Sequence, residues 1–529
     1  MFRNHLAPIS GTIEESDPTP LAAALREIAE ETTLTVPRNL TFLRHGPRYT
    51  FTDRTRSVNR EWTIYPFAFA LRDPASENEA KIKIDWEHSS WNWFSPDDVH
   101  DVPSFGGVPH LADSLRRVWF EKELGNGPGR VLREGLEELR GDYESGARVL
   151  AGKALGILRG VVQSLDVPSS PSSSSLSSCG HEPAAPGEGE REEGGIQKWW
   201  WQIRLAAWHI WKNGRESMSA PILAALLGVL GDKRIQQQLQ GQQQLVKPET
   251  ENKYGEEFKH VVLETVTAAI QARGQTTGEI AEALQAYLAR EFPYPSSPNS
   301  DSENENPLAI LTLSQSSTIS AGLAHMAKTR PLDVRVLESR PLFEGVAMAG
   351  SLINSLGPDS LTKVRLYTDA AAAVASAGVD VVLLGADRIA SSGAASNKTG
   401  SLPAVLSARH VAQQDGKSIK VVVVGDSEKI APPGRAEDHV VEENDSAMVT
   451  KTWLANDNKD AVKTSAATLT SPDLTQKKIH VEVSNIFFEW VPPDLIDTYI
   501  TEFGEQSRDD ISRKSRQLGQ EFDAILGSV

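Results

Sequence analysis

Polar residues follow apolar runs in the C-terminal half of the chain, where their chemistry suits a phosphorylated ligand. The run at 309–313 (AILTL) leads into five polar residues, 314–318 (SQSST), which open a predicted helix. The free N–H groups at the start of a helix can hold a phosphate. Ser and Thr are equally typical of an ordinary helix N-cap, so the spacing alone leaves both interpretations open.

A second polar group follows the apolar run 379–384 (VDVVLL). It begins with Asp387 and Arg388 and continues, beyond a glycine-containing loop, with Asn397 and Lys398. A carboxylate, an amide and an ammonium placed in this way suit a polar phosphorylated ligand. Each residue taken singly is also compatible with a solvated loop, and Asp387 with a helix cap or a partner for Lys398.

Three carboxylates near the N-terminus form a third pattern. The segment 20–34 (PLAAALREIAEETTL) carries Glu27, Glu30 and Glu31. On a helix this spacing brings the three onto one side, which suits a hard divalent cation such as Mg²⁺ or Mn²⁺ that bridges a diphosphate. The same spacing is common on solvated helix faces, so metal binding is a hypothesis. Glu87 is a further candidate ligand, with a surface role as the alternative.

The elements that position the C-terminal residues are predicted to form a parallel sheet. After Pro307, short apolar runs alternate with Ala-rich helical stretches. Runs that are apolar on both faces are typical of strands covered by helices on each side. Ligands of such sheets bind at the carboxyl ends of the strands, which is where the polar residues fall. We therefore predict a doubly wound, Rossmann-like α/β domain over 307–529.

The region 109–292 is predicted to be helical. In 255–274 apolar residues recur every four positions and line one helix face, which implies packing against neighbours. The Trp-rich segment 199–211 has a similar spacing; core or interface packing is its favoured role, with ligand stacking as the alternative. The two stripes consist of Phe258, Val262, Val266 and Ile270, and of Trp201, Leu205, Trp208 and Trp211.

Composition narrows the class of protein. A chain of 529 residues exceeds the usual size of one domain, so two or three are expected. Its formal charge of −17 argues against broad electrostatic contact with nucleic acid or anionic lipid. The sequence has no secretory signal and no apolar run long enough to cross a membrane, and its single cysteine, Cys179, excludes an intrachain disulfide framework. We expect a cytosolic protein.

Two polar segments interrupt these regions. Segment 166–195 has almost no large apolar residues, so it is expected to be a disordered insert within the helical region. Segment 456–476 is expected to be a loop inserted in the last domain.

Several ordered motifs between about 309 and 504 resemble the family shared by the regulatory subunits of translation initiation factor 2B and sugar-phosphate isomerases. The segment KNGRESM at 212–218 is also similar to a motif in the helical half of that family. The resemblance implies pairing of subunits through the Rossmann-like half. The C-terminal motifs are ILTLSQSST at 310–318, VLESRPLFEG at 336–345, GADRI at 385–389, NKTGS at 397–401 and FFEWVPPDLIDTYITEFG at 487–504.

In the isomerases, the resemblance implies aldose-to-ketose conversion of a phosphorylated ribose by a Cys and an Asp. Asp387 matches that Asp, whereas Ser314 stands at the position of the Cys and Leu313 at that of a preceding His. A Ser hydroxyl does not titrate near neutral pH, as a thiol can, unless a neighbouring base helps it. The positions that match sugar-phosphate-binding residues are Arg215, Arg340, Asn397 and Lys398.

Two functions follow for the C-terminal half. The first is that of a regulatory-subunit-like protein that binds a sugar phosphate or nucleotide and associates with itself or with related subunits, since such subunits generally lack the complete catalytic pair. The alternative is an isomerase of the ribose-1,5-bisphosphate or methylthioribose-1-phosphate type, in which Asp387 works with an atypical partner at Ser314. No cofactor is expected at this site.

The N-terminal segment resembles Nudix proteins. ISGTIEESD at 9–17 and DWEHSSWNWFSPDDV at 85–99 are similar to segments of that family. The resemblance implies a partial α/β/α Nudix domain over 1–108 that uses Mg²⁺ or Mn²⁺, with diphosphate hydrolysis as a third possible function. The residues that reproduce the REUxEE core of the Nudix box are Arg26, Glu27, Glu30 and Glu31.

The Nudix box departs from the family pattern at two places. Pro18 stands where a Glu is expected, with Asp17 one residue away, and Thr33 replaces a Gly. Only ten residues precede Gly11, so the domain is expected to be incomplete at its N-terminal side.

Overall fold

The structure is a computed structural model that divides into two compact units. The first comprises residues 1–219, 225–270 and 521–529, and the second residues 220–224 and 271–520. Of the predicted insert, residues 168–194 with Cys179 lie outside the described part of the chain, as do 456–459 and 472–476 of the predicted loop, whose described part forms helix α17 (Asp460–Leu469). The described residues are 5–53, 59–101, 104–143, 145–167, 195–242, 248–294, 306–358, 360–434, 443–455, 460–471 and 481–529.

The N-terminal part of the first unit is built around helix α1 (Pro20–Thr32). The Thr19 hydroxyl accepts the N–H of Ala22 at 3.1 Å and Pro20 occupies the first turn, so the helix starts with an N-cap and a residue that needs no donor partner. Its apolar side joins a small core with Leu34 and Leu40. The other elements are strands β1 (Leu40–His45), β2 (Tyr49–Asp53), β3 (Arg60–Ile64) and β4 (Phe67–Leu71), helix α2 (Ala75–Glu79) and 3-10 helix η1 (Pro96–Asp98); β1 pairs with β4, and β2 with β3, both antiparallel.

The rest of the first unit is helical, as predicted. Helix α7 (Gly195–Asn213) contacts α10 (Pro248–Ala272) through Trp199, which lies outside the predicted stripe: its ring is 5.6 Å from that of Phe258 between centroids, and both side chains are buried. Of the predicted stripe, Leu205 and Trp208 are buried, whereas Trp201 and Trp211 are partly exposed. Within the described residues, none of the helices is long and apolar enough to cross a membrane. The helices are α3 (Leu111–Val118), α4 (Phe120–Leu124), α5 (Asn126–Gly141), α6 (Ala147–Ser164), α7 (Gly195–Asn213), η2 (Glu216–Met218), α8 (Ser219–Leu230), α9 (Lys233–Gln242) and α10 (Pro248–Ala272).

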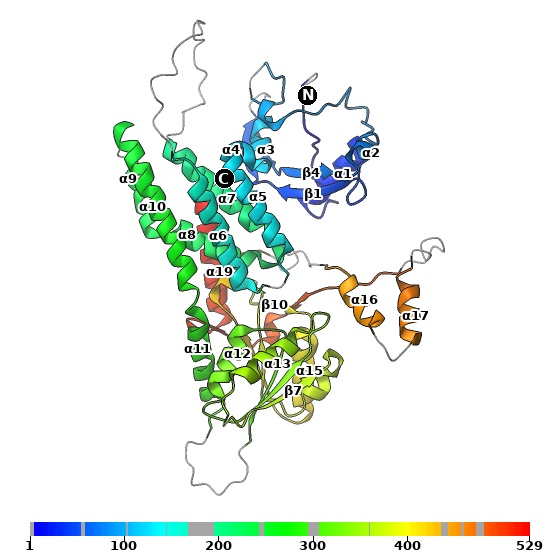
Figure 1. The fold of residues 1–529 in the computed structure, drawn as a ribbon, viewed down its shortest axis with the longest axis vertical. Helices are drawn as coiled ribbons and strands as arrows, with labels where there is room; N and C mark the ends of the chain where they lie inside the picture. The colour runs from blue at the N-terminus through cyan, green and yellow to red at the C-terminus, as the bar shows by residue number, and fades with distance from the viewer. Residues whose placement is uncertain are drawn as a thin grey trace. The chain divides into compact units, whose positions relative to one another are not determined.

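The second unit contains a seven-stranded sheet in the order β14-β13-β11-β8-β5-β6-β7, parallel except for β14. Figure 1 shows helices α12 (Ser317–Met326), α13 (Glu344–Ser355) and α15 (Ser401–Gln414) of this unit alongside the strands of its sheet. Strand β5 lies between β6 and β8. The chain adds β6 and β7 on one side of β5 and then adds β8, β11 and β13 on the other side. This strand order confirms the predicted doubly wound arrangement. The strands are β5 (Leu308–Leu313), β6 (Leu332–Leu337), β7 (Lys363–Tyr367), β8 (Val381–Leu384), β11 (Lys420–Val424), β13 (Thr498–Thr501) and β14 (Gly504–Gln506).

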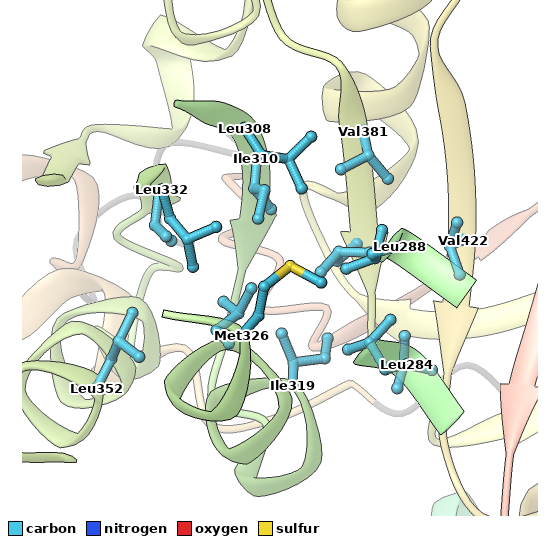
Figure 2. Close-up of a cluster of buried hydrophobic side chains, with 14 of the residues drawn as sticks. Leu284, Leu288, Leu308, Ile310, Ile319, Met326, Leu332, Leu352, Val381 and Val422 are labelled. Atoms are coloured by element: carbon cyan, nitrogen blue, oxygen red, sulfur yellow. The ribbon is translucent and has the colours of Figure 1, made fainter. Parts of the chain in front are cut away.

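Helices cover this sheet and close its core. Side chains of α11, α12 and α13 pack against Ile310, Val381 and Val422 on one face, with Met326 among them (Figure 2). Because successive residues of a strand point to opposite faces, the other residues of these strands meet a second layer, and α15 packs on β8. The helices are α11 (Thr276–Glu291), α12 (Ser317–Met326), α13 (Glu344–Ser355), η3 (Asp369–Ala371), α14 (Ala372–Ala375), α15 (Ser401–Gln414), η4 (Ser427–Lys429), α16 (Ala447–Leu454), α17 (Asp460–Leu469), η6 (Pro493–Leu495) and α19 (Arg508–Ile525).

The second unit also contains a small antiparallel sheet that the sequence pattern does not predict. Its order is β12-β10-β9, with β9 (Arg388–Ile389), β10 (Ala395–Lys398) and β12 (Phe488–Val491). Its strands carry Asn397 and Lys398 opposite Glu489 and Phe488.

The core of the second unit supplies a stability prediction. Leu323 of α12 is fully buried in the core cluster of this unit, so Leu323→Ala should lower the local opening free energy by about 2–5 kcal/mol through lost contacts and a residual cavity. Leu406→Ala on α15 is the matched control, because that leucine is 50% exposed. Hydrogen exchange of α12 and β5 peptides would measure both, and equal effects would contradict the assignment of the core.

Candidate functional site

The candidate site lies at the carboxyl ends of β5 and β8, where the strand order reverses. Ser314 follows β5 directly, and Asp387 follows β8 after the dipeptide Gly385-Ala386. Both side chains are half-buried. Gly385 lets the backbone approach Asn397 closely, since a Cβ at that position would stand only 3.2 Å from the Asn397 amide oxygen. In open α/β sheets a ligand crevice forms at this reversal, so the predicted Asp387 and Ser314 occupy the expected position.

The backbone after β5 is held in an unusual conformation. Ser314 has a φ of 62° and Ser339, which follows β6, has a φ of 61°. The Ser314 N–H donates to the Ser339 hydroxyl at 2.7 Å, and that hydroxyl lies 3.2 Å from the Leu337 carbonyl that accepts it. Left-handed conformations cost non-glycine residues of the order of 1–3 kcal/mol and cluster where a site requires them. The two strand ends are thus locked together.

Arg340 is an exposed cation at the end of β6. Its side chain is 55% exposed, and its Nε donates to Glu338 at 3.0 Å. The carboxylate of Asp369 accepts the N–H groups of both Ser339 and Arg340 at 2.8 Å, which fixes the backbone from which the guanidinium projects. A guanidinium presented in this way can bind a phosphate through two parallel hydrogen bonds.

Asn397 and Lys398 lie on strand β10 and are buried, so neither is a solvated loop residue. The Asn397 amide donates to the Ser401 hydroxyl at 2.9 Å. The Lys398 side chain is 3% exposed, and its Nζ lies 2.9 Å from a carboxylate oxygen of Glu344 and 4.1 Å from the centre of the Phe487 ring. Glu344 therefore neutralises the charge of Lys398 inside the protein.

Internal carboxylates also occupy backbone donors at this edge. Glu489 accepts the N–H of Gly400 at 2.6 Å and of Leu402 at 3.0 Å, at the start of α15. Glu502 accepts the Ser427 N–H at 2.9 Å, as Asp369 does at the end of β6. A phosphate at any of these places would have to displace a carboxylate. Of the two predicted cations in this unit, Lys398 is buried and Arg340 is exposed, so Arg340 is the more accessible to a phosphate.

The polar cluster 314–318 acts at least in part as a helix cap. The Ser316 hydroxyl accepts the N–H of Ile319 at 3.2 Å and caps α12. This is the ordinary one of the two interpretations that the sequence allowed.

Arg215 belongs to the first unit, where it is buried. Its Nε donates to the Ser217 hydroxyl at 3.2 Å, and its guanidinium donates to the carbonyl oxygen of Asp142 and lies 4.6 Å from the centre of the Tyr143 ring. These contacts give it a structural role within that unit. Its predicted part in ligand binding stays a prediction.

Arg26 holds the acidic residues of α1. It donates to Glu27 at 2.8 Å, to Glu30 at 3.2 Å and to Asp17 at 2.9 Å. Hydrogen bonding to Arg26 lowers the pKa of Asp17. Asp17 therefore pairs with Arg26, although the Glu expected from the Nudix box would stand one residue later, at Pro18. Gly11 makes room for this arrangement, because a Cβ there would overlap the Glu27 carboxyl group.

Glu31 is buried beside His88. Burial raises the pKa of the Glu31 carboxyl, and its Oε2 lies 3.6 Å from Nε2 of His88. The other ring nitrogen of His88 is 3.0 Å from Asp85, and this hydrogen bond raises the His88 pKa. In the described part of the chain, no three or more His, Cys, Asp or Glu side chains are grouped as metal ligands would be.

The carboxylates of α1 thus do not fit a divalent cation as they are arranged. Arg26 already satisfies Glu27 and Glu30, and His88 faces Glu31. The predicted metal role of Glu27, Glu30 and Glu31 stays a prediction from the sequence, as do both roles of Glu87, whose side chain is exposed.

Sequence reasoning missed three acidic residues of the C-terminal site. Asp369 follows β7 just as Asp387 follows β8, so the rule that found one would have found the other. Glu344 lies inside the quoted VLESRPLFEG segment. Glu489 gave no signal, because its role depends on the pairing of β10 with β12, which no local pattern predicts.

The pairing of Lys398 with Glu344 is testable through stability. Glu344→Gln should destabilise α13 and β10 by about 1–3 kcal/mol, because it leaves a buried ammonium without its carboxylate. Glu338→Gln is the control: its partner Arg340 is exposed, and a change below about 1 kcal/mol is expected. Hydrogen exchange of peptides from α13 and β10 reports both, and an unchanged Glu344→Gln variant would show that the pair is dispensable.

Comparison with known proteins places this geometry in a family. The sequence pattern of the Initiation factor 2 subunit family matches residues 235–507, and that of the NUDIX domain matches residues 2–117. No curated protein matches the chain significantly.

Solved structures that are similar to the chain share little sequence with it. The Pyrococcus horikoshii OT3 translation initiation factor eIF-2B has 17% identity, covers 72% of this chain and 98% of its own, and has a TM-score of 0.44. A chain of the tetrameric eIF2B-beta2-delta2 complex from C. thermophilum has 12% identity, covers 76% of this chain and 98% of its own, and has a TM-score of 0.44. The 5-methylthioribose 1-phosphate isomerase from P. horikoshii OT3 has 17% identity, covers 74% of this chain and 87% of its own, and has a TM-score of 0.42. Because the family pattern alone spans just over half of the sequence, the chain belongs to the Initiation factor 2 subunit family and carries a NUDIX domain at its N-terminal end.

Proposed function

We propose that this protein is an initiation factor 2B regulatory-subunit-like protein that binds a sugar phosphate or nucleotide at the carboxyl edge of its seven-stranded sheet. One observation carries the proposal: the half-buried Ser314 and Asp387 follow the two strands between which the strand order reverses. The end of the next strand adds the exposed cation Arg340. Hydroxyl, carboxylate and guanidinium groups at such a crevice suit a ligand with both hydroxyls and a phosphate.

Self-association is part of the proposal. Members of the family form oligomeric complexes, of which the beta2-delta2 tetramer is one. The partners proposed for this chain are a second copy or related subunits.

The binding proposal is tested by calorimetric titration of the full chain with ribose 1,5-bisphosphate, methylthioribose 1-phosphate and nucleoside monophosphates. Arg340→Ala should weaken binding of the ligand by about tenfold or more, because a charge-assisted contact with phosphate is lost. Arg513→Ala, which removes an exposed arginine from α19, should bind normally. Absence of heat with every ligand would remove the proposal and direct attention to protein partners.

Isomerisation is the second candidate function, and the proximity of β5 and β8 favours it. Asp387 would act as the acid or base and Ser314 as its partner. A hydroxyl transfers protons less readily at neutral pH than a thiol, so Ser314→Cys should raise any turnover of methylthioribose 1-phosphate. Asp387→Asn should abolish turnover while binding persists. Turnover that is unaffected by Asp387→Asn would exclude this role.

Diphosphate hydrolysis by the NUDIX domain stays a prediction from its sequence motif. The contacts of Arg26 with Glu27 and Glu30 give it no structural support. Phosphate release from a nucleoside diphosphate sugar in the presence of Mn²⁺, lost in Glu30→Gln, would establish the activity. No release from the unmutated chain would dismiss it.

A further inference from the structure

The NUDIX domain exposes a group of aromatic side chains between α2 and α3. Trp86 is 87% exposed and Trp93 66%, and Trp91 and Phe94 are also exposed. Four large aromatic side chains are thus exposed in one short segment, with Trp91 and Trp93 in ring contact, and clustered apolar exposure of this kind marks interaction surfaces. Tryptophan is also the residue most often responsible for binding energy in protein interfaces. We call these four residues the tryptophan surface.

The orientation of Trp93 is held by hydrogen bonding and ring contact. Its indole N–H donates to Glu79 at 3.1 Å, and its ring meets that of Trp91 edge to face at 6.0 Å between centroids. Most of the Trp93 ring nevertheless faces solvent. The structure thus offers an aromatic platform with a carboxylate at its edge, positioned before any partner arrives.

The charge around the tryptophan surface decides which partner it suits. Six carboxylates and only two lysines lie between residues 77 and 98. Among the residues that the structure describes, Glu77, Glu87, Asp97 and Asp98 have no ion-pair partner. The segment 77–98, which carries the tryptophan surface, therefore has an excess of negative charge, which attracts cations and repels phosphates.

We propose that the tryptophan surface binds an arginine- or lysine-rich segment of a partner protein. A guanidinium or ammonium group is attracted to the face of an indole ring, and Trp is the strongest of the aromatic acceptors. The same cation can pair with Glu79 at the edge of the Trp93 ring, and the exposed carboxylates Glu87, Asp97 and Asp98 belong to the same segment of chain. The surface is independent of the site at the carboxyl edge of the sheet and requires no metal.

Other occupants fit these observations less well. A nucleotide would stack on the rings but bring its phosphates against the carboxylates, and an anionic lipid surface would meet the same repulsion. A second copy of this chain carries the same formal charge of −17. The basic segment is the one occupant for which both the rings and the charges are favourable.

The test is fluorescence anisotropy of a labelled Arg-Gly repeat peptide with the full chain, beside a Glu-Gly repeat peptide of equal length. The Arg-Gly peptide should bind, more weakly at higher salt, and the Glu-Gly peptide should not. The double variant Trp86→Ala/Trp93→Ala should weaken binding by at least about tenfold. Phe503→Ala, which removes an aromatic ring that is 73% exposed in the second unit, should leave binding unchanged.

A second pair of variants separates this surface from the general acidity of the chain. Glu87→Gln/Asp97→Asn/Asp98→Asn should weaken binding several-fold, whereas the same number of exposed carboxylates removed from α10 should have no effect. Equal losses in the two variants, or binding that survives Trp86→Ala/Trp93→Ala, would overturn the proposal. Preferential binding of AMP or of phosphatidylserine vesicles to the tryptophan surface would overturn it as well. The α10 control is Glu256→Gln/Glu257→Gln/Glu264→Gln.

Discussion

The C-terminal site depends on one topological constraint, the reversal of strand order about β5. The chain leaves β5 for β6 and β7 on one side and resumes at β8 on the other, so the loops after β5 and β8 must diverge to opposite faces of the sheet. The divergence opens a crevice that neither loop could form alone. The left-handed residues Ser314 and Ser339 and the carboxylate of Asp369 then hold the strand ends that line it.

Many charged side chains that could bind a ligand are instead paired within the protein. Lys398 meets Glu344, Glu489 occupies the start of α15, and Arg26 gathers the acids of α1. The contacts of Lys398 and of Arg26 occupy charges that the sequence alone would assign to ligand or metal binding, and Glu489 occupies backbone donors that could otherwise hold a phosphate. Arg340 and the tryptophan surface differ because they are exposed, and we infer from this that ligand and partner meet the protein at these two places.

The sequence was sufficient for the sheet and for part of the site. The strands around Leu311, Val336 and Val422 were predictable because fully buried parallel strands are apolar on both faces. The small sheet was not, since Asn397 and Lys398 are polar and are buried only through long-range pairing with β12. The partners Glu344 and Glu489 were missed for the same reason: a carboxylate in a sequence does not reveal which cation or N–H group it will meet.

The most direct test of the carboxyl-edge site is hydrogen exchange of the full chain with and without ribose 1,5-bisphosphate, read peptide by peptide. A ligand in the crevice should slow exchange in segments 314–318, 339–344 and 385–398, because it restricts the loops after β5, β6 and β8. Exchange elsewhere in the seven-stranded sheet should change less. Protection confined to other segments, under conditions where calorimetry detects binding, would contradict the account of this site.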